Sequence, residues 1–189
     1  MNDFLHVRAL LGILLGLGLG RLLSGMVRFI QHPGRQPVYA VHLGWAAFLF
    51  VLLTHLWWWE FRLTLVQDWT YAIYAVLIAN IVLLYLLCTL LFPDDINEYA
   101  GFRDYFHSRR GWFFGLLALS FAVDLLDSLV KGHDYLQGLG AAYLLRNAAF
   151  IALCLAAIRI RAEWFHRAFV VAAIAMEAWW IVRLYAHLE

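Results

Sequence analysis

Charged residues are scarce in this chain: they make up 14% of its 189 residues, whereas 65% are hydrophobic and 17% are aromatic. A soluble domain carries roughly 25% charged and about 45–50% apolar residues. With so few polar groups, a water-soluble fold could not cover its own surface. Membrane lipid is therefore predicted to surround most of the chain, which excludes a soluble globular domain.

Other scarcities exclude further classes of protein. The net charge is +1 and Lys131 is the sole lysine, so there is no electrostatic basis for binding nucleic acid. The two cysteines, Cys88 and Cys154, lie inside apolar runs and lack CxxC spacing, which indicates small buried side chains rather than a redox pair or a metal site. Catalytic signatures such as HExxH, GxSxG or a glycine-rich phosphate loop are also absent, so no enzymatic activity is predicted.

Long apolar runs make up most of the sequence. A spanning helix takes roughly 20 mostly apolar residues, and the runs here are continuous instead of alternating as in a membrane barrel. The sequence therefore predicts an all-α protein, a polytopic transmembrane helical bundle in which residues 1–189 form a single domain. The six predicted spans are 4–26, 38–59, 69–92, 111–130, 138–160 and 164–187.

The longest connection, PDDINEYAGFRDYFHSRR, follows the third span. Pro93 ends that span, and Asp94 and Asp95 are favourable residues for the start of another helix. Apolar side chains then recur at helical spacing, opposite acidic ones. This pattern predicts an amphipathic helix in the membrane plane over about 94–107, with a solvated loop as the alternative.

Arginine and lysine are unevenly distributed between the connections. The segments after the first, third and fifth spans carry more of them than the other side, which predicts that these segments are cytoplasmic and that both termini lie outside the cytoplasm. Tryptophans gather at the ends of the predicted spans, where aromatic belts form. They include Trp57, Trp58, Trp59, Trp69, Trp112 and Trp164.

Small residues recur every four positions in the first span, namely Gly12, Gly16, Gly20 and Ser24. This spacing lets a second helix approach closely, because packing rather than hydrophobicity drives helix association in lipid. The second helix is either another span of this chain or part of another protein. A homo-oligomer or a partner in a membrane complex is accordingly one hypothesis.

Ionisable residues lie inside the fourth to sixth spans. Asp124 and Asp127 are three residues apart on one helical face, with Lys131 ahead of them. At about 1.5 Å per residue, Asp124 and Arg146 both lie roughly 10–12 Å below the same boundary, which predicts that they pair. Glu177 lies slightly deeper, His55 approaches from the second span, and Asn80 and Asn147 are near the middle of the membrane.

Each charge at such depth costs roughly 2.5–3.5 kcal/mol on insertion scales. It persists by pairing or by lining a wet cavity. Because carboxyl groups outnumber basic groups here, either some of them are protonated or a cation is bound, or both. The cluster predicts a site that passes protons or holds a cationic or polar ligand. In the alternative interpretation, the same groups only join the helices to one another.

Two histidines on one span can ligate stacked haems, and His42 and His55 are suitably spaced for this. Each haem would need a histidine at equal depth on another helix, and the remaining histidines fall at span ends or in connections. No cofactor is therefore predicted, and a haem-binding electron carrier ranks last among the functions considered.

Six short strings carry a resemblance: GLGLGRLLSG, VHLGW, WWWEF, DWTY, LLFPDD and YFHSRRGWFF. Together they resemble a group of uncharacterised bacterial multi-pass membrane proteins of about this size, over residues 11–115. The resemblance implies a location in the bacterial inner membrane, and it supplies no activity, ligand or catalytic residue.

The function predicted from the sequence is a small channel, transporter or ligand-binding protein of the membrane. Its site would be the buried cluster of Asp124, Asp127, Arg146 and Glu177, with His55 and Asn147 nearby. The alternative is a non-catalytic structural or assembly subunit of a membrane complex.

Overall fold

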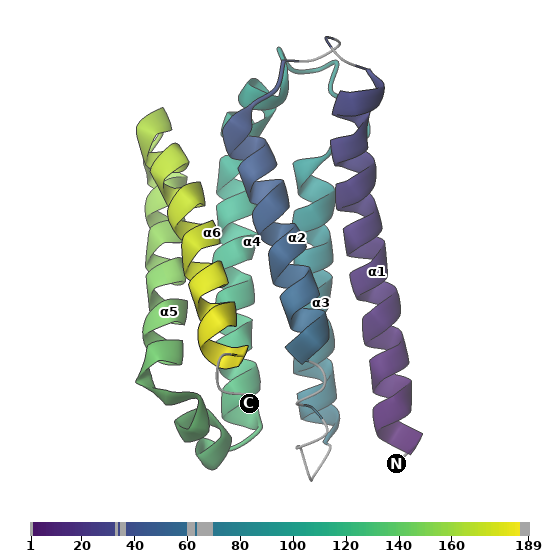
Figure 1. Ribbon diagram of the computed structural model, residues 1–189, viewed down its shortest axis with the longest axis vertical. Coiled ribbons are helices and arrows are strands. Elements are labelled where there is room, and N and C mark those ends of the chain that lie inside the picture. Colours follow the sequence, from purple (N-terminus) through teal and green to yellow (C-terminus); the bar gives the residue numbers. More distant parts are fainter. Residues whose placement is uncertain (1, 33, 35–36, 60–62, 64–69, 186–189) are drawn as a thin grey trace.

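A computed structural model describes residues 2–32, 34, 37–59, 63 and 70–185, and in these residues the fold is all-α. Six helices are long and apolar enough to cross a membrane, as the sequence predicts (Figure 1). They are α1 (Asn2–Gln31), α2 (Ala40–Trp59), α3 (Tyr71–Leu91), α4 (Phe102–Val130), α5 (His133–Arg159) and α6 (Glu163–Tyr185).

The predicted in-plane helix over 94–107 is wrong. Residues 94–101 form turns and bends, and α4 begins at Phe102 and continues without a break to Val130. The apolar residues of this stretch face the protein core instead of the membrane surface. Phe102 and Phe106 are buried, and the Phe102 ring stacks on His42 with 4.8 Å between ring centroids. The helical spacing of Phe102 and Phe106 therefore belongs to the first turns of a spanning helix.

The helices run up and down in chain order (Figure 1). The last turns of α1, α3 and α5 lie at one end of the bundle, and the start of α1 and the last turn of α6 lie at the other, hereafter the terminus-bearing end. Within the bundle, α4 packs between α3 and α5, and α1 packs on α3. The main neighbour of α6 is α2, and it meets α5 only slightly.

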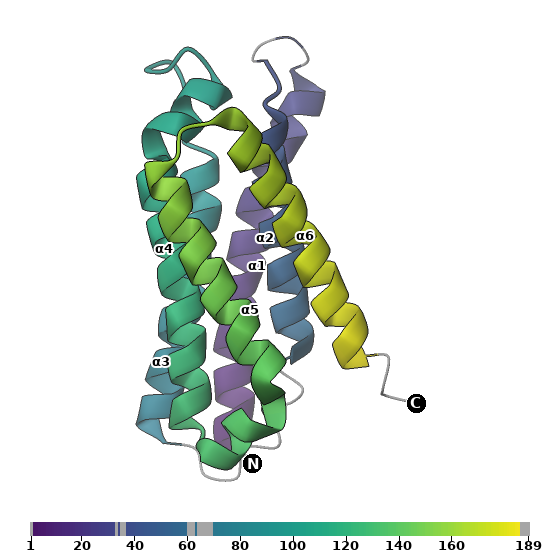
Figure 2. The same cartoon turned by 90° about the vertical axis from the view of Figure 1, so that its left-hand side faces the viewer.

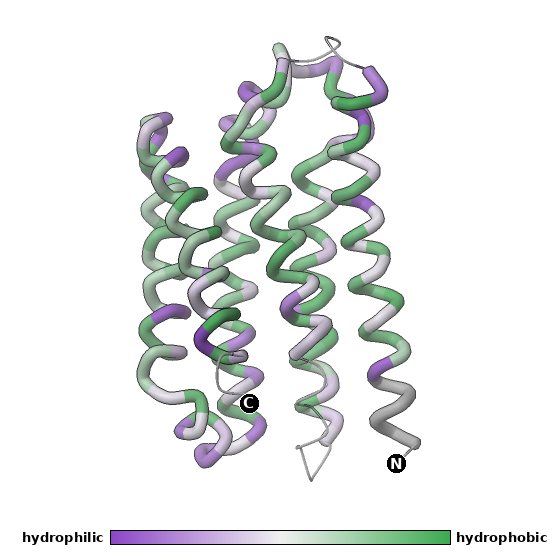
Figure 3. Tube along the Cα trace, viewed as in Figure 1, coloured by the Kyte–Doolittle hydropathy of each residue, from purple (hydrophilic) through white to green (hydrophobic). Residues whose placement is uncertain are grey.

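Hydrophilic residues are concentrated in particular parts of the bundle. Figure 3 shows apolar residues along most of each span and hydrophilic residues at the two ends, with a further group in the half nearer the termini. At the opposite end, Arg21 of α1 donates a hydrogen bond of 2.8 Å to the carbonyl oxygen of Phe92 and pairs with Asp94. The hydrogen bond and charge of Arg21 hold the pKa of the exposed Asp94 carboxyl below its ordinary value. This contact fixes α1 to the end of α3.

The small residues of α1 do not form one contact face. Gly12 packs against the Trp57 side chain, whereas an added Cβ at Gly16 or Gly20 would meet nothing within 4 Å. Ser24 is exposed as well. The closest approach of another element is at Gly25, where a Cβ would lie 2.2 Å from the Phe92 ring. The intramolecular packing face therefore runs through Gly18 and Gly25, and Gly16, Gly20 and Ser24 face outward.

Gly25→Ala should destabilise the bundle, because the new methyl group overlaps the Phe92 ring. Overpacking of this kind costs about 1–3 kcal/mol. Gly20→Ala is the matched control on the open face of the same helix and should leave stability unchanged or slightly raised. The free energy of unfolding is measured by denaturant titration of the detergent-solubilised protein. Equal effects of the two substitutions would contradict this packing.

Candidate functional site

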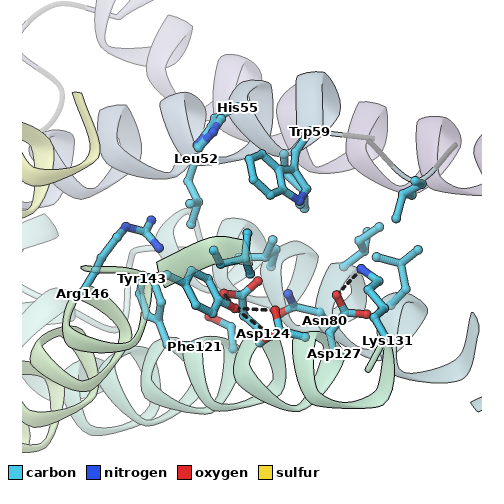
Figure 4. Close-up of a pocket in the computed structure, with 18 of the residues that line it drawn as sticks. Leu52, His55, Trp59, Asn80, Phe121, Asp124, Asp127, Lys131, Tyr143 and Arg146 are labelled. Atoms are coloured by element: carbon cyan, nitrogen blue, oxygen red, sulfur yellow. Dashed lines mark hydrogen bonds and ion pairs between the residues drawn. The ribbon is translucent and has the colours of Figure 1, made fainter. Parts of the chain in front are cut away.

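A cavity opens between α2, α3, α4 and α5 in the half of the bundle nearer the terminus-bearing end (Figure 4). Its volume is about 90 Å³ for the centres of water-sized molecules. Since one water needs roughly 10–15 Å³ on this measure, several waters or one small solute would fit. Its wall combines apolar and aromatic side chains with a few ionisable groups.

Most of the polar side chains lie along one wall of the cavity. Asp124, Asn80, Asp127 and Lys131 follow one another along the cavity, and His55 of α2 lies across from them with Leu52 and Trp59 (Figure 4). Asp124 and Asp127 of α4 share a face with Lys131, the residue that ends this helix, because they are three and four positions apart. Asn80 comes from the middle of α3.

Asp124 is held by neutral groups. The Tyr143 hydroxyl donates a hydrogen bond of 2.7 Å to its Oδ2, and Ser128 Oγ lies 2.8 Å from the same hydroxyl. Because Tyr143 has one hydroxyl proton, which Asp124 accepts, Ser128 is the donor to Tyr143. Among the described residues no basic side chain forms an ion pair with Asp124. Within this part of the chain, the direct side-chain partner of its carboxyl group is therefore a neutral hydroxyl.

Asp127 has a basic partner but keeps one oxygen vacant. Its Oδ2 pairs with Lys131 Nζ one helical turn ahead, and the Lys131 side chain is only 2% exposed. The Oδ1 atom of Asp127 is buried without a hydrogen-bond partner, and so is Oδ1 of Asn80. Unpaired buried acceptors are rare in folded proteins, so these two mark a place where a hydrogen-bond donor is expected.

Glu177 of α6 is fully buried and lies behind the cavity wall. It pairs with Arg146 of α5 and accepts a 2.7 Å hydrogen bond from Nδ1 of His55 of α2. The predicted Asp124–Arg146 pair is thus wrong, because Arg146 points to Glu177 and Asp124 to Tyr143. Arg146 Cζ also lies 5.4 Å from the ring centroid of Phe121 and 5.5 Å from that of Trp180.

The first part of α5 covers the cavity at the terminus-bearing end. Gly140, with φ 76° and ψ 170°, breaks the helix, and the short helical piece before it turns across the bundle (Figure 2). A side chain other than hydrogen is strained in this conformation, which explains a glycine there. Tyr135 and Leu139 of this piece line the cavity, and the Tyr135 ring centroid is 5.4 Å from Lys131 Nζ.

Four of the six predicted ligand-site residues line the cavity: Asp124, Asp127, Arg146 and His55. Glu177 supports two of them from behind. Asn147 is buried outside the cavity wall, and its Nδ2 donates 3.2 Å to the Tyr143 carbonyl. Sequence reasoning missed Tyr143 and Ser128. Their signal was present, since Tyr143 precedes Arg146 by three positions and Ser128 follows Asp124 by four.

No group of three or more His, Cys, Asp or Glu side chains that could hold a metal ion occurs in the described part of the chain. The two α2 histidines are engaged with neighbouring elements. His42 Nε2 lies 2.7 Å from the carbonyl oxygen of Leu91, and His55 contacts Glu177.

Comparisons with protein-family models, with curated proteins and with solved structures find no match to this chain. Its function is therefore inferred from the geometry of the cavity.

Glu177→Gln should destabilise the bundle strongly, because it leaves the buried Arg146 charge without a counter-charge. Removing one partner of a buried pair costs about 3–5 kcal/mol. Glu163→Gln is the control: its partners Arg103 and Arg167 are 67% and 69% exposed. Exposed pairs of this kind contribute at most about 1 kcal/mol. Denaturant titration of both variants measures the difference, and similar losses would contradict the role of Glu177.

Proposed function

We propose that the chain is a small membrane channel or transporter that binds cations or protons in the cavity between α2 and α5. Asp124 is its central titratable group. The observation that carries this proposal is the charge balance of the cluster. Among the described residues, the carboxyl groups of Asp124, Asp127 and Glu177 have two basic partners, Lys131 and Arg146, which pair with Asp127 and Glu177. Asp124 therefore takes its counter-charge from a proton or a bound cation.

The surroundings of Asp124 support the same function. A carboxylate in a membrane-spanning segment is costly and is retained mainly where it serves a pathway or a binding site. The cavity has room for water beside Asp124, which permits a small cation to reach it without being stripped of all hydration. Glu177, by contrast, is enclosed by Arg146 and His55 and positions them.

The proposal includes the location of the protein and its orientation in the membrane. The bias of arginine toward the α1–α2, α3–α4 and α5–α6 connections supports an orientation with these connections in the cytoplasm, and the sequence resemblance supports the bacterial inner membrane. The terminus-bearing end and the cavity would then face outward.

Asp124→Asn should lower cation flux at least tenfold, because the substitution removes the uncompensated charge and keeps the hydrogen bond to Tyr143. Asp134→Asn is the matched control: it removes the same charge at the same end, from an exposed residue outside the cavity. In proteoliposomes, an entrapped pH-sensitive dye reports proton flux, and tracer uptake reports Na⁺, K⁺ and methylammonium. Flux no faster than in protein-free liposomes, or equal flux in both variants, would refute the proposed function.

A structural or assembly subunit is the second candidate, and the outward face of α1 favours it. Gly16, Gly20 and Ser24 are exposed at four-residue spacing on this helix, at the edge of the bundle. Small residues so spaced allow close contact with a helix of another protein or of a second copy.

Gly16→Leu tests this face, because a leucine side chain there would hold a second helix away without a clash inside the protein. If α1 forms a homo-oligomer contact, the variant should shift the native mass spectrum of mildly solubilised protein toward the monomer. An unchanged distribution of species would argue against assembly through α1.

A further inference from the structure

Residues that line the cavity carry three hydrogen-bond acceptors that a guest could use, beside one unpartnered donor, Nε of Arg146. The acceptors are the Asp124 carboxylate and the vacant Oδ1 atoms of Asn80 and Asp127. Asn80 and Asp127 are only 8% and 7% exposed, so bulk water does not satisfy them. A guest for this site therefore carries positive charge and several donors.

Lys131 shows which chemistry this wall accommodates. Its ammonium group pairs with Asp127 Oδ2, faces the Tyr135 ring at 5.4 Å, and is almost completely enclosed. An alkylammonium head is thus already bound between a carboxylate and an aromatic ring. The vacant acceptors belong to the same wall, and the rings of Phe121 and Trp180, which also line the cavity, face a second cation, the Arg146 guanidinium.

Resting on the proposed function, we propose that the cation bound in this cavity is a primary ammonium group: ammonium itself or the head of a small alkylamine. Its three N–H donors would be accepted by Asp124, Asn80 and Asp127. Ca²⁺ instead takes six to eight oxygen ligands, more than this wall presents. The small volume excludes bulky amines, and a quaternary ammonium has no N–H to donate.

Lys131 would then act as a tethered competitor, because it already occupies one oxygen of Asp127. Replacing it by methionine frees that oxygen and removes a neighbouring positive charge. Lys131→Met should accordingly bind methylammonium about tenfold more tightly than the unaltered chain, the change expected from one charged hydrogen bond.

Thermal unfolding of the full chain in detergent at pH 7 tests the assignment, with methylammonium, tetramethylammonium and sodium chloride titrated at equal ionic strength. Methylammonium should raise the unfolding temperature at concentrations at least about tenfold lower than the other two. Asp124→Asn should abolish this shift, and Asp134→Asn should retain it. The result with these two variants decides the question even if Lys131→Met does not fold.

The outcomes separate this inference from the proposed function. Equal stabilisation by sodium and methylammonium, lost in Asp124→Asn, would overturn the ammonium assignment and leave a general cation site. Equal stabilisation by tetramethylammonium would show that N–H donors are not recognised, which also overturns it. No stabilisation by any cation, together with no flux in proteoliposomes, would remove both proposals.

Discussion

The buried contact of Glu177 with Arg146 and His55 joins three helices that pack only partly on one another. The α6 helix lies mainly against α2 and meets α5 slightly, so the Glu177–Arg146 pair is the principal polar link across that gap. The same carboxylate orients His55 through Nδ1. Buried pairs contribute little net stability compared with apolar packing, but they penalise every arrangement that separates the charges. The pair therefore fixes how α6 is rotated relative to α2 and α5.

The pairing of Glu177 with Arg146 also determines which charged groups of the cavity have a partner. With Arg146 committed to Glu177 and Lys131 to Asp127, Asp124 is left to neutral partners. In a low-dielectric setting an uncompensated carboxylate is a strong attractor for protons and cations. The cluster therefore divides into two parts. Glu177, Arg146 and His55 join helices, whereas Asp124 is the group to which the proposed function assigns the cation.

The glycines of the fold also have more than one role. Gly25 is required where α1 meets the Phe92 ring, whereas Gly16 and Gly20 have no other element near them. In α5, Gly140 bends the chain so that Tyr135 and Leu139 reach over the cavity. The regular four-residue spacing in α1 therefore includes one glycine with a close neighbour, Gly12, and two without one, Gly16 and Gly20.

The sequence by itself determined the six helices, since apolar runs of this length have no other way to satisfy their backbone in lipid. It also determined which residues share the ionisable half, because depth follows from position along a helix. Only the tertiary structure decided the partners. Asp124 and Arg146 lie at similar depth, yet which neighbour each one faces depends on how the helices are rotated and on the bend at Gly140. For the same reason Phe102 and Phe106 proved to belong to the core and not to a helix on the membrane surface. Helical spacing marks an apolar face, and only packing shows what covers it.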